Sequence, residues 1–580
     1  PRLELVRTTL GEHLVAIVWL PRELLTTGSR TAIADMLGEA TGATLANWSL
    51  QLGEGDIAQI RYMFDLPPHA DVPDSEPLDR RLTEMLRGWE PAVEAQLAEL
   101  EPANRAARLA IDYAAAFPGT YRTHSTPSEA ATDILRMNAL PDGQARGCRL
   151  YRKERDPDGR LRLKIYRKGA LIPLSEAVPV LENFGFRVLE EIPTPLSGGD
   201  VGYIHDFLLD VANPDGIAQL LENAAIAEGA IAATLEGRAE NDLFNELIVT
   251  VGLQPEETVL FRAWFRYLRQ TGFSYGLATV EALKKAPGVA RDIIAYFRAL
   301  HQPGQRDDKR AEALHAAIET GLKQVSAIDD DRMLRRFRAV VRATLRTNAF
   351  SPAAKEALAF KIDLSGIPGL PAPVPWREIW VYSPRVEGIH LRGGPIARGG
   401  LRWSDRRDDF RTEILGLMKA QVVKNAVIVP TGAKGGFYAK QLPAPSDRDA
   451  WLAEGTESYR IFIRSLLSVT DNIVDGKVVH PAKVVVRDGE DPYFVVAADK
   501  GTATFSDTAN GLAQEAGFWL DDAFASGGSA GYDHKKMGIT ARGAWEAVKR
   551  HFREMNIDIQ STPFSVAGVG DMSGDVFGNG

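Results

Sequence analysis

One glycine-rich stretch gathers cationic side chains at a spacing that suits the binding of a carboxylate. It reads GGPIARGGLRW, then a helical segment, then TGAKGGF. Arg398 lies in the first part and Lys434 between the glycines of the last, while Gln421 and Lys424 lie towards the end of the helical segment. Glycines beside a lysine let a substrate approach the backbone, because no Cβ stands in the way. The stretch therefore predicts a carboxylate-binding pocket that contains an activated amine.

Two other interpretations of this stretch are open. We expect Lys434 to lie in a tight turn made by its neighbouring glycines. A phosphate-binding loop is one alternative, but GAKGGF lacks both the G-x-x-x-x-G-K-[ST] spacing and the hydroxyl that binds Mg²⁺. A β-turn with a surface lysine is the other, and GAKGG alone would favour it. Because Arg398 and Lys424 accompany the turn, we favour the binding pocket.

Two further predicted strands end in residues that suit chemistry. The run VVAAD ends at Asp499, which is either a helix cap or a general acid/base. The run FSVAGVGDMSGD contains Gly568-x-Gly570-x-x-Ser573, which has the form of a Rossmann opening, where helix amides face a pyrophosphate. It lacks the third glycine of that motif. No metal site is predicted.

Length and charge limit the classes of protein that fit. At roughly 150 residues per domain, 580 residues predict about four domains. Hydrophobic residues make up 45% and charged residues 25%, as in ordinary globular proteins, so a disordered or collagen-like chain is excluded. Lys and Arg number 68 against 77 Asp and Glu, a net charge of -9, so no overall basic field exists to bind nucleic acid.

The cysteine count and the ends of the chain predict its compartment and extent. Cys148 is the only cysteine in the sequence, so no internal disulfide forms, which fits a reducing compartment and predicts a cytoplasmic protein. No run approaches the roughly 18 apolar residues that span a bilayer, and no membrane association is predicted. The chain begins at Pro1 and stops in a glycine-rich turn, so we expect a piece of a longer protein.

The N-terminal part contains a pattern that occurs twice. Each copy predicts strands and one helix in a β-α-β-β arrangement on an antiparallel sheet, as in ACT-like ligand-sensing modules, although purely structural spacers fit the pattern equally well. The first copy contains LVAIVWL, a helix over 32–40, TLANWSLQL and IAQIRYMFDL; the second contains CRLYRKE, RLRLKIYR, PLSEAVPVLENFG, FRVLEEI and YIHDFLLD.

The remainder divides into a helical region and an α/β region. Amphipathic helices are predicted from Pro255 to Gly272 and from Asp329 to Thr347, with their arginines on the solvated face. The proline cluster over 365–378 predicts a domain boundary. After it, the strand-like runs EIWVY, GIHLR, AVIVP, KVVVRD, YFVVAAD and FSVAGVG alternate with helical segments, which is typical of an α/β fold.

Three strings in the last part carry a resemblance to a known family. They are ARGGLRWSDRRDDFRTEILGLMKAQVVKNAVIVPTGAKGGF, FASGGSAGYDHKKMGITARGAWEAVKRHF and VAGVGDMSGDVFGNG, in that order. They resemble the large bacterial NAD-dependent glutamate dehydrogenases, directly from about Trp376 to Gly580 and by layout before that. The resemblance implies oxidative deamination of L-glutamate to 2-oxoglutarate and ammonium, with hydride transfer to NAD.

The resemblance also implies roles for individual residues. Lys434 matches the lysine that polarises the substrate and activates water, and Asp499 matches the aspartate that carries a proton to and from the amino group. The remaining matches concern binding: Gln421 and Lys424 hold the α-carboxylate, Arg398 holds the side-chain carboxylate where the small hexameric relatives have lysine, Thr540 contacts the nicotinamide carboxamide, and Gly568, Gly570 and Ser573 belong to the dinucleotide turn.

The resulting domain plan is multidomain, α/β and α+β. A homo-oligomer with amino-acid effectors at the ACT-like modules is expected. The alternative is a regulatory or scaffolding array whose α/β module does not catalyse. The predicted domains are an ACT-like module at 1–100, a second ACT-like module with a helical lead-in at 101–210, a helical regulatory region at 211–364, the substrate domain at 365–560 and the start of a dinucleotide-binding domain at 561–580.

Overall fold

The computed structural model describes the chain in two compact units. One contains Pro1–Leu174 and Val188–Leu209, and the other contains Ser175–Arg187 and Asp210–Gly580. No helix among the described residues is long and apolar enough to cross a membrane. The structure describes all residues except 10–11, 53–55, 68–72, 87, 142, 144, 155, 212–213, 274–275, 277, 422–428, 499–504, 525–528, 530–536 and 568–580.

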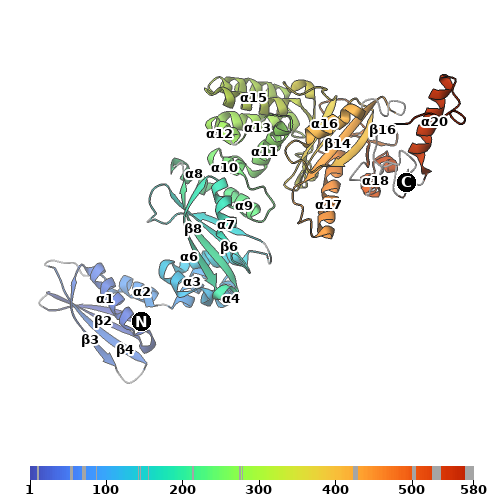
Figure 1. Ribbon diagram of the computed structural model, residues 1–580. Helices are drawn as coiled ribbons and strands as arrows, with labels where there is room; N and C mark the ends of the chain where they lie inside the picture. The colour runs from blue at the N-terminus through green and yellow to red at the C-terminus, as the bar shows by residue number, and fades with distance from the viewer. Residues whose placement is uncertain are drawn as a thin grey trace. The chain divides into compact units, whose positions relative to one another are not determined.

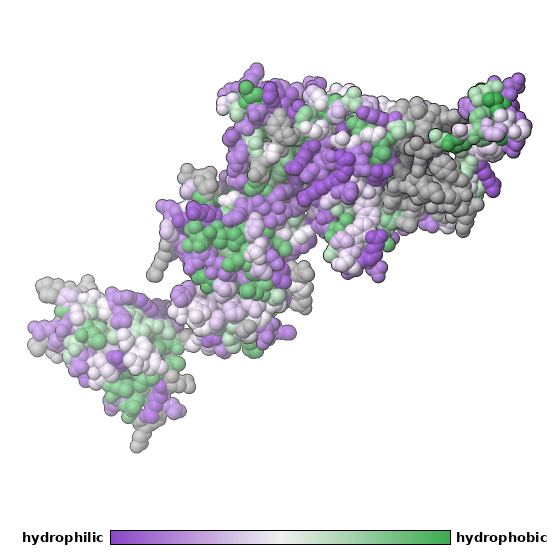
Figure 2. Space-filling view, viewed as in Figure 1, coloured by the Kyte–Doolittle hydropathy of each residue, from purple (hydrophilic) through white to green (hydrophobic). Residues whose placement is uncertain are grey.

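The first unit begins with a four-stranded antiparallel sheet of order β1-β2-β4-β3 (Figure 1). Side chains alternate between buried and exposed along β4, and the buried ones pack with Leu37 and Leu82 of the two helices. The edge strand β3 keeps apolar side chains such as Leu50 and Leu52 exposed, and Figure 2 shows apolar colour on this module. Its elements are β1 (Arg2–Arg7), β2 (His13–Pro21), α1 (Thr27–Thr41), β3 (Thr44–Leu52), β4 (Ile57–Asp65) and α2 (Ser75–Leu86).

A second sheet in this unit repeats the topology. Its order is β5-β6-β8-β7, which has the same strand sequence as the first sheet. The elements are β5 (Gly147–Tyr151), β6 (Arg160–Arg167), β7 (Phe186–Leu196) and β8 (Gly202–Val211), with α7 (Leu174–Asn183) between β6 and β7 in the chain. Four helices precede it and share a core with Tyr166 of β6: α3 (Trp89–Leu100), α4 (Ala103–Tyr113), α5 (Gly119–His124) and α6 (Pro127–Asn138).

The order of elements in the first module corrects the prediction. The structure adds β1 before the predicted strands and α2 after them, so the order is ββαββα rather than β-α-β-β. The run RLELVR gave no strand signal because only Leu3 of its six side chains is fully buried. With β1 included, the two modules have matching sheets, which strengthens the predicted repeat.

The second unit opens with a helical region. The helix predicted from Pro255 is confirmed as α11, which starts with proline at its first position and a capping box between Gln254 and Glu257. The helix predicted from Asp329 is α15, but it ends at Ala343 and the chain continues as a strand. The helices are α8 (Ile217–Glu222), α9 (Ala224–Leu235), α10 (Glu246–Thr250), α11 (Pro255–Gln270), α12 (Ala278–Lys285), α13 (Pro287–His301), α14 (Asp308–Leu322) and α15 (Ile328–Ala343).

A seven-stranded sheet follows, in the order β17-β13-β14-β12-β11-β10-β9. β13 is parallel to both β14 and β17, and the other pairs are antiparallel. The strands are β9 (Thr344–Thr347), β10 (Leu358–Ile362), β11 (Arg377–Tyr382), β12 (Val386–Arg392), β13 (Ala397–Trp403), β14 (Thr431–Ala439) and β17 (Val496–Ala498). A separate hairpin pairs β15 (Asn472–Val474) with β16 (Lys477–Val479).

The two faces of the sheet are covered by different helices (Figure 1). One face packs against α11, α13, α15 and α16 (Phe410–Gln421), and its core includes Trp380, Leu391 and Ile414. The other packs against α17 (Arg448–Leu467) and α18 (Ser506–Glu515), and its core includes Leu401 and Phe437. The last described helix is α20 (Ile539–Glu554).

Two predictions about this region are wrong. The boundary at 364/365 falls inside the sheet domain, because β9 and β10 precede the prolines yet form its far edge. The run KVVVRD is not a strand. Its end is held instead by Arg487, whose backbone NH donates to the carbonyl of Leu345, and by ion pairs of Asp488.

Glycines in β13 and β14 allow the two strands and α16 to approach closely. A Cβ on Gly399 would overlap the carbonyl oxygen of Ala433 in β14. A Cβ on Gly435 would overlap Leu401, and one on Gly436 would overlap Ile414 of α16. None of the three has a positive φ, so their role is steric. At Gly399 the obstacle is backbone, whereas at Gly435 and Gly436 the nearest atoms belong to the side chains of Leu401 and Ile414.

We expect Gly399→Ala to lower the free energy of unfolding of the sheet domain by about 3 kcal/mol, because backbone must move to admit the methyl group. Gly416→Ala is the matched control: this glycine is in α16 and a Cβ there meets nothing. It should stabilise the helix by about 0.5–1 kcal/mol. Hydrogen exchange of the β13 and β14 amides measures both effects, and equal protection in the two variants would contradict the packing role of Gly399.

Candidate functional site

Arg398 and Lys434 project from neighbouring parallel strands towards the same helix. Arg398 lies opposite Gly432 in the register of β13 and β14. Leu401 belongs to the core beneath α17, so alternation turns Arg398 to the other face, which α16 covers. The ion pair of Arg402 with Glu413 of α16, 3.0 Å, confirms that even-numbered residues of β13 face this helix.

Lys434 reaches the same face from β14. Its register partner Leu391 packs in the core beneath α16, and Gly436, two residues along, lies against Ile414. The side chain of Lys434 is only 2% exposed, whereas Arg398 is half-buried. The predicted tight turn is wrong: Lys434 is inside strand β14, and its glycines serve close strand packing. Two of the three cations that the sequence singled out, Arg398 and Lys434, are thus brought to one face of the sheet.

Helix α16 is fixed over this face by a buried arginine. Arg411 is 1% exposed and forms a bidentate pair with Glu378 of β11, at 2.9 and 2.7 Å. Its backbone NH donates to Gln270 of α11. Bidentate pairing to a buried carboxylate restricts both position and rotation of the helix. The register of α16 therefore determines where its last residue, Gln421, comes to lie.

For the other predicted site residues, the structure describes either the backbone without the side chain or nothing at all. The side chain of Gln421 and the whole of Lys424 are outside them, as is the side chain of Thr540 at the start of α20. Asp499 is also outside, but the residue before it, Ala498, pairs with Leu401 beside Arg402. The turn residues Gly568, Gly570 and Ser573 are outside as well.

A cavity of about 1020 Å³ lies at the carboxyl ends of β13 and β14. Part of its wall is aromatic: Trp403 stacks on Trp451 with ring centres 4.5 Å apart, and Phe505 lies beside Trp403. Neither Arg398 nor Lys434 lines it. Ligands of open α/β sheets often bind outside the carboxyl ends of the strands. This hollow lies at that end of β13, whereas Arg398 is the second residue of the strand.

A buried network of ion pairs holds the segment that leads into β17. Arg392, at the end of β12, pairs with Asp491 and donates to the carbonyl of Tyr493 at 2.8 Å. Lys361 of β10 donates to both Asp491 and Asp488, at 2.6 and 2.5 Å. All four charged side chains are less than a tenth exposed. Five residues after Asp491 the chain enters β17.

Arg346 of β9 extends the network. It pairs with Asp488 at 2.6 Å and with Asp471 at 2.7 Å, and His480 also bonds to Asp471. Burial alone would raise the pKa of Asp491, but the charges and hydrogen bonds of Arg392 and Lys361 outweigh it and hold that pKa below its usual value. Burial would likewise raise the pKa of Asp471, but the hydrogen bonds and the charge of Arg346 outweigh it, so that this pKa is also lowered.

Sequence reasoning missed this network. The only signal was the cluster of acids in RDGEDP, directly after the valines that predicted a strand. Among the described residues, no group of three or more His, Cys, Asp or Glu side chains is arranged to hold a metal ion. Asp488 and Asp491 of this segment have lysine and arginine partners instead.

We expect Asp491→Asn to destabilise the sheet domain by about 3–5 kcal/mol, because Arg392 and Lys361 lose a buried partner. The control Asp329→Asn changes an exposed acid in α15 and should have little effect. Hydrogen exchange of the β10 and β12 amides measures the loss of stability in each variant.

The network also predicts acid sensitivity. Asp471 and Asp491 have lowered pKa values, so their stabilisation is complete above the ordinary aspartate pKa of about 3.9. It is lost as the pH falls below that value and through the lower pKa of the folded state. Urea midpoints measured between neutral and acidic pH should therefore fall most steeply below about pH 4, and less steeply in Asp491→Asn.

Five family models match the chain, and together they cover most of it. Residues 317–580 match "Bacterial NAD-glutamate dehydrogenase, catalytic domain". Four models describe parts of glutamate dehydrogenase: the ACT2 domain at residues 2–90, helical motif 2 at 96–140, the ACT3 domain at 146–222 and helical motif 3 at 239–303. The predicted ACT-like modules are thereby confirmed as ACT domains.

Curated relatives agree with the family models. Three are called NAD-specific glutamate dehydrogenase: those of Halomonas elongata, 43% identical over 100% of this chain, Mycobacterium tuberculosis, 45% over 97%, and Pseudomonas aeruginosa, 42% over 100%. The matched regions are 36%, 37% and 36% of those proteins, so the chain spans little more than a third of their length.

Proposed function

Since the chain belongs to the bacterial NAD-glutamate dehydrogenases, we propose that it supplies the glutamate-binding and proton-transferring residues of that reaction. The reaction is oxidative deamination of L-glutamate to 2-oxoglutarate and ammonium, with NAD as hydride acceptor. One observation carries the proposal: Arg398 and Lys434 project from adjacent parallel strands onto one face, beneath a helix that ends at Gln421.

The charges of glutamate suit this arrangement. Its two carboxylates require two cationic groups, which Arg398 supplies for the side chain and Lys424, with Gln421, for the α-carboxylate. An arginine binds a carboxylate through a planar fork, which fixes its orientation better than an ammonium. Lys434 polarises the substrate carbon and activates the water that displaces nitrogen.

Asp499 completes the proton transfers. The backbone at Ala498 lies beside Leu401, on the strand that carries Arg398. We propose that the acid directly after this position accepts a proton from the substrate ammonium. NAD, when bound, takes the hydride from the α-carbon. Thr540 is proposed to contact the nicotinamide, and Gly568, Gly570 and Ser573 to open the Rossmann turn that holds the pyrophosphate.

The remaining parts of the chain are assigned to regulation. We propose that the ACT domains bind amino-acid effectors, and that the enzyme is a cytoplasmic homo-oligomer. The competing proposal is a regulatory or scaffolding array with a non-catalytic α/β module. NADH formation by the full-length protein with a panel of amino acids separates them: glutamate-dependent NADH supports the enzyme, and its absence with every amino acid supports the array.

Asp499→Asn in the full-length enzyme should lower kcat by about two to four decades, with KM for glutamate and the melting temperature nearly unchanged. Asparagine keeps the size of the side chain and caps a helix, but it cannot accept a proton. If Asp499 were only a cap, Asn would keep the rate and Ala would cost about 1 kcal/mol of stability. A wild-type kcat in the Asn variant would therefore remove the residue from the mechanism.

Lys424→Ala should raise KM for glutamate by about ten- to a hundredfold, because a charge-assisted hydrogen bond to the α-carboxylate is worth roughly 1.5–3 kcal/mol. Lys419→Ala is the control: Lys419 is an exposed lysine in the last turn of α16. Steady-state kinetics with varied glutamate give both values. An equal KM in the two variants would place the carboxylate elsewhere.

A further inference from the structure

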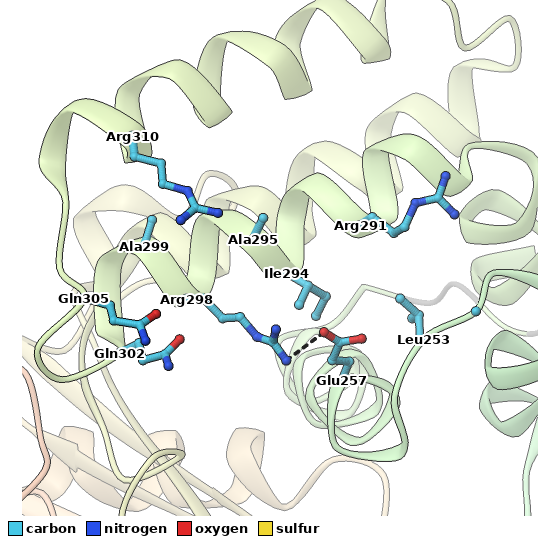
Figure 3. Close-up of a pocket in the computed structure, with 11 residues that line it drawn as sticks. Leu253, Glu257, Arg291, Ile294, Ala295, Arg298, Ala299, Gln302, Gln305 and Arg310 are labelled. Carbon is cyan, nitrogen blue, oxygen red and sulfur yellow. Dashed lines mark ion pairs between the residues drawn. The ribbon is translucent and has the colours of Figure 1, made fainter. Parts of the chain in front are cut away.

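A polar cavity lies in the helical region of the second unit, apart from Arg398 and Lys434. It has a volume of about 360 Å³ and is lined by α13, the start of α14 and the segment around Gly252 and Leu253 (Figure 3). This volume is near the lower limit for small-molecule sites, which hold ligands of metabolite size.

The hollow exists because α13 presents small side chains where its neighbours are large. Ala295 and Ala299 are one turn apart and form its floor. Around them stand Arg298 and Arg310, and Gln302 and Gln305 lie together at one end (Figure 3). Arg310 points from α14 towards the part of α13 that carries the two alanines (Figure 3).

The lining is strongly cationic. It contains Arg291, Arg298 and Arg310 against the single carboxylate of Glu257. Arg298 pairs with Glu257 at 2.9 Å, and Arg291 donates to the carbonyl of Val251. Among the residues that the structure describes, no partner is found for the guanidinium of Arg310. Three arginines with one acid leave an excess of two positive charges, and the glutamine amides add neutral donors.

We propose that this cavity is a binding site for a compact dianion, either a phosphoryl group or a pair of carboxylates. Arg298 and Arg310 would hold the anion from two helices, because guanidinium groups suit both carboxylate and phosphate. Glu257 competes with the ligand for Arg298.

Helix α13, which supplies much of the lining, packs against the sheet of the second unit. Phe297, next to Arg298, packs on Phe350 and on Phe360 of β10, with ring centres 5.8 and 6.3 Å apart. The residue after Phe360 is Lys361, a member of the ion network that holds the approach to β17. A ligand that orders α13 therefore acts on residues packed against the strand that carries Lys361.

Calorimetric titration of this chain with inorganic phosphate and with succinate tests the proposal without any need for catalysis. Arg310→Gln should weaken binding by about ten- to a hundredfold, because it removes one charge-assisted contact. Glu257→Gln should strengthen it by about tenfold, because the competing carboxylate is lost while glutamine keeps the capping box of α11. The control Arg332→Gln, an exposed arginine of α15 that does not line the cavity, should leave binding unchanged.

The outcomes are distinct. Binding of phosphate alone assigns a phosphoryl ligand, and binding of succinate alone assigns a dicarboxylate, provided that both Arg310→Gln and Glu257→Gln shift it as stated. Binding that neither variant alters belongs to another site and overturns the proposal, as does no binding of either probe at about 10 mM. Failure here leaves the proposed deamination untouched, because glutamate-dependent NADH formation is measured separately.

Discussion

The ion pairs among Arg346, Lys361, Arg392 and their aspartates are the interaction on which the catalytic part of this chain depends. Each buried charge loses its hydration, which costs several kcal/mol per ion. This cost is offset only where oppositely charged partners and hydrogen bonds are close and numerous. Here each aspartate bonds to at least two donors, so no charge is left alone. The network joins β9, β10 and β12 to a segment without regular structure, and that segment ends in β17. An edge strand of only three residues has few ladder bonds of its own, so side-chain pairs must place it.

The distance between β13 and β14, and between these strands and α16, is determined by steric space rather than by charge. Gly399, Gly435 and Gly436 each stand where a methyl group would overlap a neighbouring strand or α16. This packing explains why a lysine lies inside a strand and remains almost fully buried. Glycine thus has two different roles in this chain. Gly272, just after α11, has a φ of +91° that favours glycine, whereas Gly399 allows two strands to approach closely.

Patterns within short stretches of sequence predicted the helices and strands that such stretches form. Amphipathic spacing located α11 and α15, and alternation located most strands of the ACT domains. Arg398 and Lys434 could be singled out because glycines mark them in the sequence. The ion network could not be predicted, because Arg346 and Asp488 are 142 residues apart and no local period relates them. The valines of KVVVRD misled for the same reason: the flanking charged side chains, whose partners lie far away in the chain, decide the conformation of that run.

Topology explains why the helix that ends at Gln421 covers both cations. Parallel strands cannot be joined by a tight turn, so β13 and β14 need a crossover, and α16 is that crossover. The next crossover, through α17, returns past β13 to β17 on its other side. Because such connections are right-handed, a reversal of direction puts the second helix on the opposite face. The cores agree, with α16 and α17 on different faces. Arg398 and Lys434 project towards α16 by alternation, so the first crossover places this helix over the two residues that we propose to bind glutamate, and the reversal in strand order keeps α17 on the other face.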